Sequence, residues 1–154
     1  MAGFNTPKTR QENITINNRS RARLPFSQGR IKRGILKALK LLKKPRSGRP
    51  LGVVFLNDKE IRELNRKYLN HDSPTDVLAF DYRALGSELA ISLDTAARNA
   101  KIYNTSPKEE IMLYIIHGIL HLCGYNDTTM KAKKKMFKKQ SAILKALKRL
   151  NAYP

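Results

Sequence analysis

The chain has 154 residues, the size of one compact domain, and 41% of them are hydrophobic, which excludes a disordered polycation. Lys and Arg number 31 against 12 Asp and Glu, and the resulting net charge of +19 favours a polyanionic partner. No apolar run approaches the roughly 18 residues of a membrane span, and the polar start lacks a signal-peptide core. We therefore expect a cytoplasmic protein with no membrane partner.

The positive charge lies at the two ends of the chain. Residues 1–50 hold 14 basic side chains and one acid, Glu12, and residues 128–154 hold nine basic side chains and no acid. The segment between them, residues 51–127, contains more acidic than basic side chains. An acidic centre between basic flanks is typical of a cation site within a surface that binds a polyanion.

The first half of the chain reads as a strand, a helix, a strand and a helix. Alternating polar and apolar residues predict a strand over 12–17, after a flexible basic tail over 1–11. Ser27 is a good N-cap for a cationic helix that ends before the turn-rich segment 45–50. A buried strand follows over 51–56, and then a helix that is capped by Asp58 and runs to about Tyr68.

A loop, a hairpin and further helices follow. Pro74 and the Asn, Asp, Ser and Thr residues around it predict a loop over 70–76, and strands over 77–82 and 88–92 lie close enough to form a hairpin. Asp94 opens the next helix. Strands and helices mix without strict alternation, so we expect one α+β domain over residues 12–150, a small mixed sheet packed with helices.

The last 25 residues predict a basic amphipathic helix from Met130 to Leu150. Its lysines fill one side, and we expect its apolar residues to dock on the domain. Those residues are Met136, Phe137, Ile143, Leu144, Leu147 and Leu150. The lysines are suited to a polyanion such as RNA, and an anionic membrane is the weaker alternative because aromatic residues are few.

The strongest chemical signal lies on a helix near the middle of the domain. Ser106, Pro107 and Glu109 form a capping box with Pro at the first helical position. His117 and His121 follow four residues apart, so both imidazoles face the same side and can bind one metal ion. The alternative is that both histidines are packed core residues.

A third ligand can come from just beyond the end of this helix. Gly124 suits a left-handed helix end, and a chain reversal there would return Asp127 towards the histidines. Alternatively, Asp127 caps the next helix. Gly118 stands where zinc peptidases carry a Glu base, so this pattern disfavours peptide hydrolysis and fits the hydrolysis of a phosphodiester better.

Two stretches resemble the YbeY endoribonuclease family. HGILHLCGYND, at 117–127, is similar to the family signature H-G-x-L-H-L-x-G-Y-D-H. LNRKY at 64–68, followed by DSPTDVLAF at 72–80, is similar to L-N-x-x-Y-R-x-x-D-x-P-T-D-V-L-S-F. The two motifs occur in the family's order and together cover about half of the chain.

The resemblance implies a single-strand-specific, zinc-dependent endoribonuclease with one Zn²⁺ per chain. It implies a cytoplasmic role in maturing the 3′ end of the small-subunit ribosomal RNA and in ribosome quality control, with single-stranded RNA, ribosomal RNA and the ribosome as partners. His117 and His121 fall on the family's first two metal ligands. The family's Asp-His is Asn126-Asp127 here, so the third ligand becomes Asp127, and its oxygen leaves Mn²⁺ or Mg²⁺ as alternatives.

A second departure concerns catalysis. Leu69 replaces the family's Arg, a residue type suited to holding a phosphate. The remaining catalytic candidates are Thr75 and Asp76, which can instead hydrogen-bond the loop, and the cation Arg98. Leu69 and Asp127 motivate a second hypothesis, a noncatalytic member that binds RNA or the ribosome and keeps its metal for folding.

Overall fold

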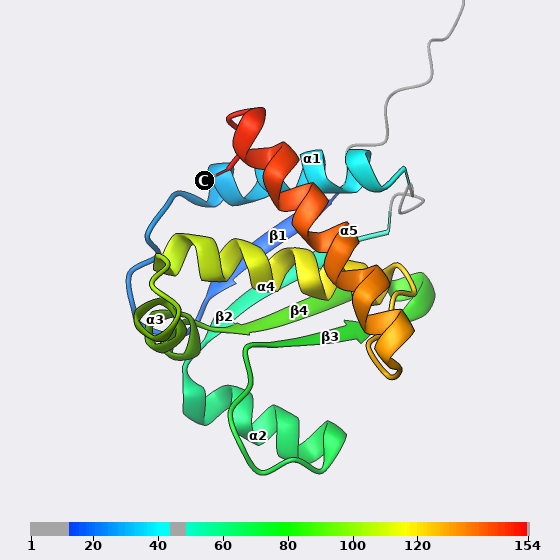
Figure 1. Cartoon of the computed structure of the whole chain (residues 1–154). Coiled ribbons are helices and arrows are strands. Elements are labelled where there is room, and N and C mark those ends of the chain that lie inside the picture. Colours follow the sequence, from blue (N-terminus) through cyan, green and yellow to red (C-terminus); the bar gives the residue numbers. More distant parts are fainter. Residues whose placement is uncertain (1–12, 44–48, 154) are drawn as a thin grey trace, which may run out of the picture.

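The computed structural model describes residues 13–43 and 49–153, and the predicted tail over 1–11 lies outside them. Four strands form one sheet in the order β1-β2-β4-β3 (Figure 1). β2 pairs in parallel with β1 and β4, while β3 pairs antiparallel with β4. The bounds are Ile14–Asn18 for β1, Leu51–Leu56 for β2, Val77–Asp81 for β3 and Ser87–Ser92 for β4. The mixed sheet and the β3–β4 hairpin are therefore as predicted.

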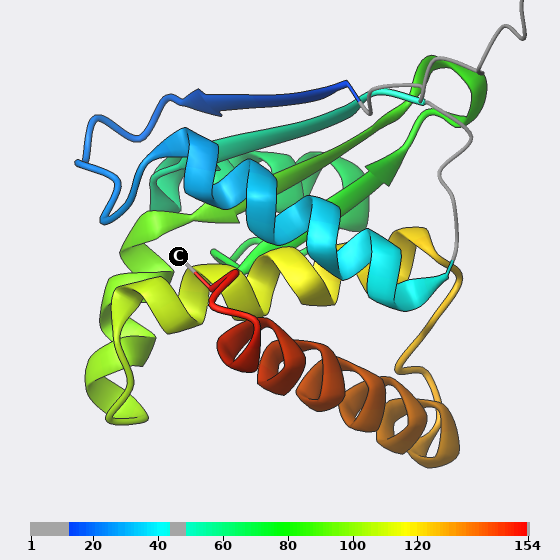
Figure 2. The ribbon, with the colours of Figure 1, turned by 90° about the horizontal axis from the view of Figure 1, so that it is seen from above.

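The described residues also form five α-helices and a short 3-10 helix over Arg83–Leu85. The α-helices are α1 (Gln28–Leu42), α2 (Asp58–Leu69), α3 (Leu93–Ile102), α4 (Pro107–Leu122) and α5 (Met130–Arg149). Helices α1 and α4 lie over one face of the sheet, α5 packs on the outer side of these two helices, and α2 covers the other face (Figures 1 and 2). None of the described helices combines the length and the apolarity needed to cross a membrane. The α+β prediction is confirmed.

The alternation of side chains along the strands divides the apolar residues between two cores. The larger core lies under α1, α4 and α5, and the smaller one lies under α2. On the central strands, the larger core receives Leu51, Val53, Phe55, Leu89 and Ile91, and the smaller one receives Leu56 and Ala90.

The strand pairings in the sheet differ in how far apart in sequence the paired residues lie. Ile14 pairs with Leu51, on the far side of α1, and Leu51 pairs with Ser87, beyond α2 and β3. Asp81 pairs with Ser87 across the short 3-10 turn. The hairpin is local, whereas both parallel pairings are long-range.

Gly118 lets α4 lie unusually close to the sheet. A Cβ atom built on Gly118 would lie 2.6 Å from Leu89 Cδ2 and 3.2 Å from Val77 Cγ2. With a larger side chain here, the Leu89 and Val77 side chains or the helix itself would have to shift. Zinc peptidases carry their Glu base at the position of Gly118. In this fold, the space that such a side chain would need is occupied by Leu89 and Val77 of the sheet.

Two predictions about individual side chains are wrong. Asn57, not Asp58, caps α2, because its side chain accepts from the Glu60 N–H while the Glu60 carboxylate accepts from the Asn57 N–H. On α5, Met136, Ile143 and Leu147 are buried as expected. Phe137 instead remains 66% exposed, and Leu150, the C-cap residue that follows the helix, remains 50% exposed, so both lie outside the buried stripe of α5.

Candidate metal centre

The geometry of the candidate metal centre depends on how α4 is held in place. Ser106 Oγ accepts from the Glu109 N–H at 3.2 Å, and the Glu109 carboxylate accepts from the Ser106 N–H at 3.0 Å. This is the predicted capping box, with Pro107 in the first turn. The helix then packs between the sheet and α5, so its rotation is set by buried residues on two sides. Its polar side chains point in fixed directions as a result.

The two histidines of α4 face one another as the spacing predicts. His117 Nε2 and His121 Nε2 lie 3.1 Å apart, and both side chains are half-buried. Two nitrogens bound to one tetrahedral Zn²⁺ at about 2.0–2.1 Å lie roughly 3.3 Å apart. The observed separation is therefore close to what a shared ion requires.

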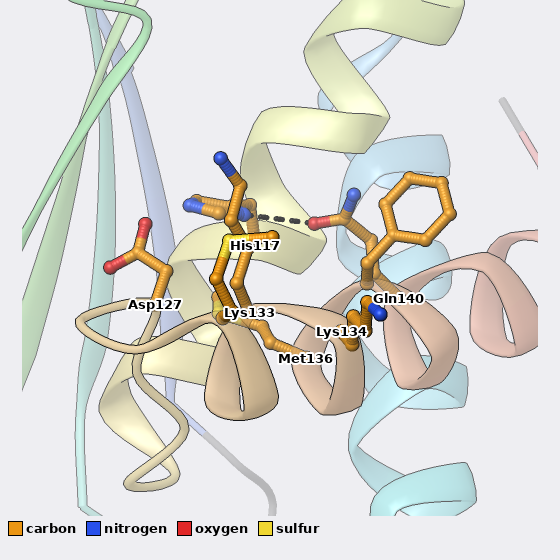
Figure 3. A pocket seen from close by; sticks show the side chains of 8 residues that line it. His117, Asp127, Lys133, Lys134, Met136 and Gln140 are labelled. Carbon is orange, nitrogen blue, oxygen red and sulfur yellow. Dashed lines mark hydrogen bonds between the residues drawn. The ribbon is translucent and has the colours of Figure 1, made fainter.

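The chain reverses directly after α4. Gly124 has φ +87°, and the Tyr125 N–H donates to the Leu120 carbonyl at 3.0 Å, which ends the helix as predicted. The loop then brings Asp127 back beside His117 (Figure 3). Thr129, rather than Asp127, caps α5 by accepting from the Ala132 N–H. The Asp127 carboxylate is therefore not used as the cap.

His117, His121 and Asp127 together form a group that could hold a metal ion. Their potential ligand atoms all lie within 4.8 Å of one another. Two imidazole nitrogens and one carboxylate oxygen are a donor set that zinc accepts in sites that keep a position open. The residues thus fit the metal that the sequence suggests, and a harder ion is also compatible with the Asp127 oxygen.

Gln140, on α5, was not singled out from the sequence. Its Oε1 accepts from His117 Nδ1 at 2.9 Å, and only 8% of the residue is exposed (Figure 3). A bond to Nδ1 leaves Nε2 as the nitrogen that faces His121. Gln140 therefore orients the imidazole and selects the nitrogen available to a metal.

A pocket of about 360 Å³ opens beside this group. His117 and Asp127 form one side of it, and residues of α5 form the rest. The α5 residues are Met130, Lys133, Lys134, Met136, Phe137 and Gln140. The volume falls within the usual range for small-ligand pockets, roughly 300–1,000 Å³.

The environment keeps His121 suited to binding a cation. Burial lowers the pKa of His121 below its usual value, the neighbouring His117 lowers it further, and the carboxylates of Asp127 and Asp76 oppose the shift. A neutral imidazole is the form that binds a metal, so this lowering favours the ligand state near neutral pH.

Thr75 and Asp76 lie where the 70–76 loop meets β3. The Asp76 carboxylate accepts from the Val77 N–H at 2.7 Å and from the Thr75 hydroxyl at 3.1 Å. These bonds are the structural role that the sequence left open. The same carboxylate opposes the lowering of the His121 pKa, so its charge also acts on the metal group.

Comparison with known proteins gives the same picture. The family model described as Endoribonuclease YbeY matches residues 15–148. The chain belongs to the YbeY family. A relative from Parabacteroides distasonis that bears the name Endoribonuclease YbeY is 48% identical over 80 residues, which are 50% of this chain and 56% of that protein. The alignment thus spans little more than half of the relative.

Two further matches cover more of the chain. An Endoribonuclease YbeY of Amoebophilus asiaticus is 36% identical over 107 residues, or 67% of this chain and 73% of that protein. The solution structure of TM1509 from Thermotoga maritima superposes with a TM-score of 0.62 at 27% identity. The superposed region covers 92% of this chain and 93% of the TM1509 chain.

The second family motif serves to hold the loop that carries Thr75 and Asp76. Asn65 is buried and donates to the Ser73 carbonyl at 2.9 Å. Asp72 accepts two bonds from Arg62, at 2.8 and 2.9 Å. The loop is therefore tied to α2 at two points, which explains why the motif spans both elements.

Arg98 lies in a different cluster from the histidines. Its guanidinium pairs with Asp58 at 2.8 Å and donates to Thr95 Oγ1 at 3.0 Å. Burial raises the pKa of Asp58, but bonds from Ser92, Arg98 and Thr95 outweigh it, and the pKa lies below its usual value. Among the described residues, those that line the pocket beside His117 do not include Arg98. Arg98 is therefore a candidate only for contacts with a substrate outside this pocket.

Leu69, which replaces the family's Arg, is the last residue of α2 and is 53% exposed. Its side chain adds apolar surface where the family motif has a cation. The nearest lysine in the sequence, Lys67, lies over the Tyr68 ring, with Nζ 5.2 Å from the ring centre. Lys133 and Lys134, which line the pocket beside His117, supply positive charge that the motifs do not predict.

Proposed function

We propose that this protein is a metal-dependent endoribonuclease that cleaves single-stranded RNA. The observation that carries the proposal is the group of His117, His121 and Asp127, with ligand atoms within 4.8 Å. It opens onto a pocket that also contains Lys133 and Lys134. Membership of the YbeY family and relatives that bear the name Endoribonuclease YbeY support it.

The proposed resident ion is one Zn²⁺ per chain, with Mn²⁺ or Mg²⁺ as the alternatives that an oxygen ligand permits. Zinc, when bound, acts as a Lewis acid and makes water a stronger nucleophile at neutral pH. The chain's own part is to hold its ligands in place, through the Gln140 bond to His117 Nδ1 and the capping box of α4. Lys133 and Lys134 attract the phosphodiester.

We propose Thr75 and Asp76 as the catalytic residues. Asp76 supplies a carboxylate that can hold a proton during hydrolysis, and the Thr75 hydroxyl donates to that carboxylate. Support comes from the charge of the Asp76 carboxylate, which is among the causes that oppose the lowering of the His121 pKa. Arg98 is the third candidate, and its ion pair with Asp58 favours a structural role for it.

We further propose that the cellular substrate is ribosomal RNA in the cytoplasm. The motif resemblance implies maturation of the 3′ end of the small-subunit RNA and ribosome quality control. The net charge of +19 supports a large polyanionic partner such as the ribosome. The lysines of α5 extend this positive charge from the pocket along the exposed side of the helix.

The test combines elemental analysis with cleavage of an end-labelled single-stranded RNA, with and without a chelator. We expect one zinc per chain, internal cleavage that the chelator stops, and recovery when zinc is restored. His121→Ala should contain no stoichiometric metal and should not cleave, and a double-stranded RNA of the same sequence should remain intact. Cleavage that persists at full rate in chelator and in His121→Ala would refute a metal-dependent enzyme.

A second function has specific observations in its favour. Leu69 provides no cation where the family motif has Arg, and Asp127 replaces the third His. A noncatalytic member that binds RNA or the ribosome and uses its metal for folding would tolerate both changes. The same experiment separates the two functions, because such a protein would bind metal and RNA and leave the RNA uncut.

A further inference from the structure

One face of α5 combines apolar and cationic side chains at helical spacing. Met130, Lys133, Lys134 and Phe137 lie three or four residues apart, so they share one side of the helix. Phe137 is 66% and Met130 73% exposed, although neighbouring Met136 is 2% exposed. Apolar side chains of this size are therefore displayed on the most basic helix of the described chain.

The same four residues line the pocket that contains His117 and Asp127. A molecule seated in this pocket would touch the apolar side chains and the lysines on one side. On the other side it would touch two members of the proposed metal group. Figure 3 shows Lys133 and Lys134 on α5, with His117 and Asp127 beside them. The pocket is thus continuous with the metal centre and shares its side chains.

The lysines are placed where the helix itself does not favour them. The first two turns of α5 contain Lys131, Lys133, Lys134 and Lys135 and no acid. The amino end of a helix carries partial positive charge, so lysine there lowers helix stability. Among the ion pairs of the described residues, the one that involves α5 is Lys148 with Glu109. Lys133 and Lys134 therefore keep their charge for a partner outside the chain.

We propose that this pocket seats one nucleotide of a single-stranded RNA next to the metal centre. Its base stacks on the Phe137 ring beside Met130, and Lys133 and Lys134 hold the flanking phosphates. The inference rests on the proposed function, whose substrate it positions. A phospholipid is disfavoured as the occupant, because one side of the pocket is formed by the Asp127 carboxylate and the His117 imidazole, which do not suit an acyl chain.

The first test measures the binding of a fluorescently labelled single-stranded RNA by anisotropy, in chelator so that cleavage does not interfere. Stacking on one aromatic residue is worth about 1–3 kcal/mol, so Phe137→Ala should weaken binding about 5- to 150-fold. Phe137→Tyr should restore most of the loss. Tyr103→Ala is the matched control, because Tyr103, the C-cap residue that follows α3, is 65% exposed and is absent from the described lining of the pocket. Equal binding by Phe137→Ala and wild type would overturn the inference.

A scan of abasic sites along the RNA identifies the stacked base. Removal of one base should weaken binding to the wild-type protein and have no effect on binding to Phe137→Ala. The same loss at that position in both proteins would contradict stacking on Phe137. Since Phe137 is exposed, the melting temperature of the variant should match that of the wild type, so that folding does not confuse the result.

The phosphate contacts are tested through salt dependence. Each lost phosphate contact lowers the slope of log affinity against log salt by about one. Lys133→Gln with Lys134→Gln should lower it by about two. Lys131→Gln with Lys138→Gln, exposed on α5 and absent from the described lining of the pocket, should lower it less. Equal decreases for the two pairs would indicate a diffuse basic surface and would overturn the assignment of the lysines.

These experiments distinguish the pocket from the activity. If wild type binds RNA through Phe137 without cutting it, the nucleotide pocket stands and the proposed enzyme fails. If Phe137→Ala binds and cuts like wild type, the pocket fails and the enzyme stands. Binding to vesicles of phosphatidylserine and phosphatidylcholine that is lost in Phe137→Ala, with RNA affinity unchanged, would assign the face to a membrane and overturn the inference.

Discussion

The bond between Gln140 and His117 allows a sharp test of how the metal centre is held. Gln140 is 8% exposed, and its Oε1 lies 2.9 Å from His117 Nδ1. Gln140→Leu keeps the approximate volume and removes the acceptor, so the imidazole loses the bond that fixes its orientation. Loss of such a partner typically lowers metal affinity 10- to 100-fold, or about 1.4–2.7 kcal/mol. We expect zinc affinity to fall within this range.

The affinity is measured by competition with a chromophoric chelator at fixed pH. Gln140→Glu keeps an acceptor at the same place and should bind zinc at least as tightly as wild type. Ser141→Ala, at the exposed neighbouring position on α5, controls for effects on the helix. Melting temperatures in chelator should agree among the variants, which separates ligand positioning from folding. Unchanged zinc affinity in Gln140→Leu, with the apoprotein folded, would refute a positioning role for Gln140.

Four further expectations concern the metal ligands, the packing of α4 and the separate cluster around Asp58. His117→Ala and His121→Ala should each lose stoichiometric metal, measured by atomic emission, and retention of one ion by both would remove this site from consideration. Asp127→Ala should also lose metal, whereas Asp127→His should keep zinc and shift the pH optimum of RNA cleavage downward, since a neutral ligand leaves the ion more positive. Gly118→Ala should lower the free energy of unfolding by about 1–3 kcal/mol in urea titrations, because its Cβ would meet the sheet; an unchanged value would show that α4 can move away. Asp58 has a lowered pKa in the folded state, so its contribution to stability is present above pH 3.8 and is lost as pH falls through the folded pKa. Asp58→Asn should therefore flatten the loss of stability between pH 5 and 3, and an identical acid transition would contradict this.

The local parts of the metal centre could be predicted from sequence. His117 and His121 lie one helical turn apart, and Gly124 marks the helix end, so neither inference needs knowledge of the tertiary fold. The return of Asp127 also follows from that chain reversal. The structure adds that Thr129 is the cap of α5, which removes the competing role for Asp127.

The parts supplied by distant elements could not be predicted in this way. Gln140 meets His117 from another helix, 23 residues away in sequence, and helical periodicity does not specify how two helices are rotated against one another. The same uncertainty in rotation placed Phe137 in the core. The error at Asp58 was avoidable, because Asn57 and Glu60 have the spacing of a capping box.

The order of the strands has a consequence for how the protein folds. β3 and β4 close a short turn, so this hairpin loses little chain entropy when it forms. The parallel pairings of β2 with β1 and with β4 each enclose at least one helix, and such long closures slow folding. Helix α4 rests through Gly118 on Val77 and Leu89, which lie on the two strands of the hairpin. We therefore expect the surface that seats the histidine-bearing helix to form early, before β1 is added at the far edge of the sheet.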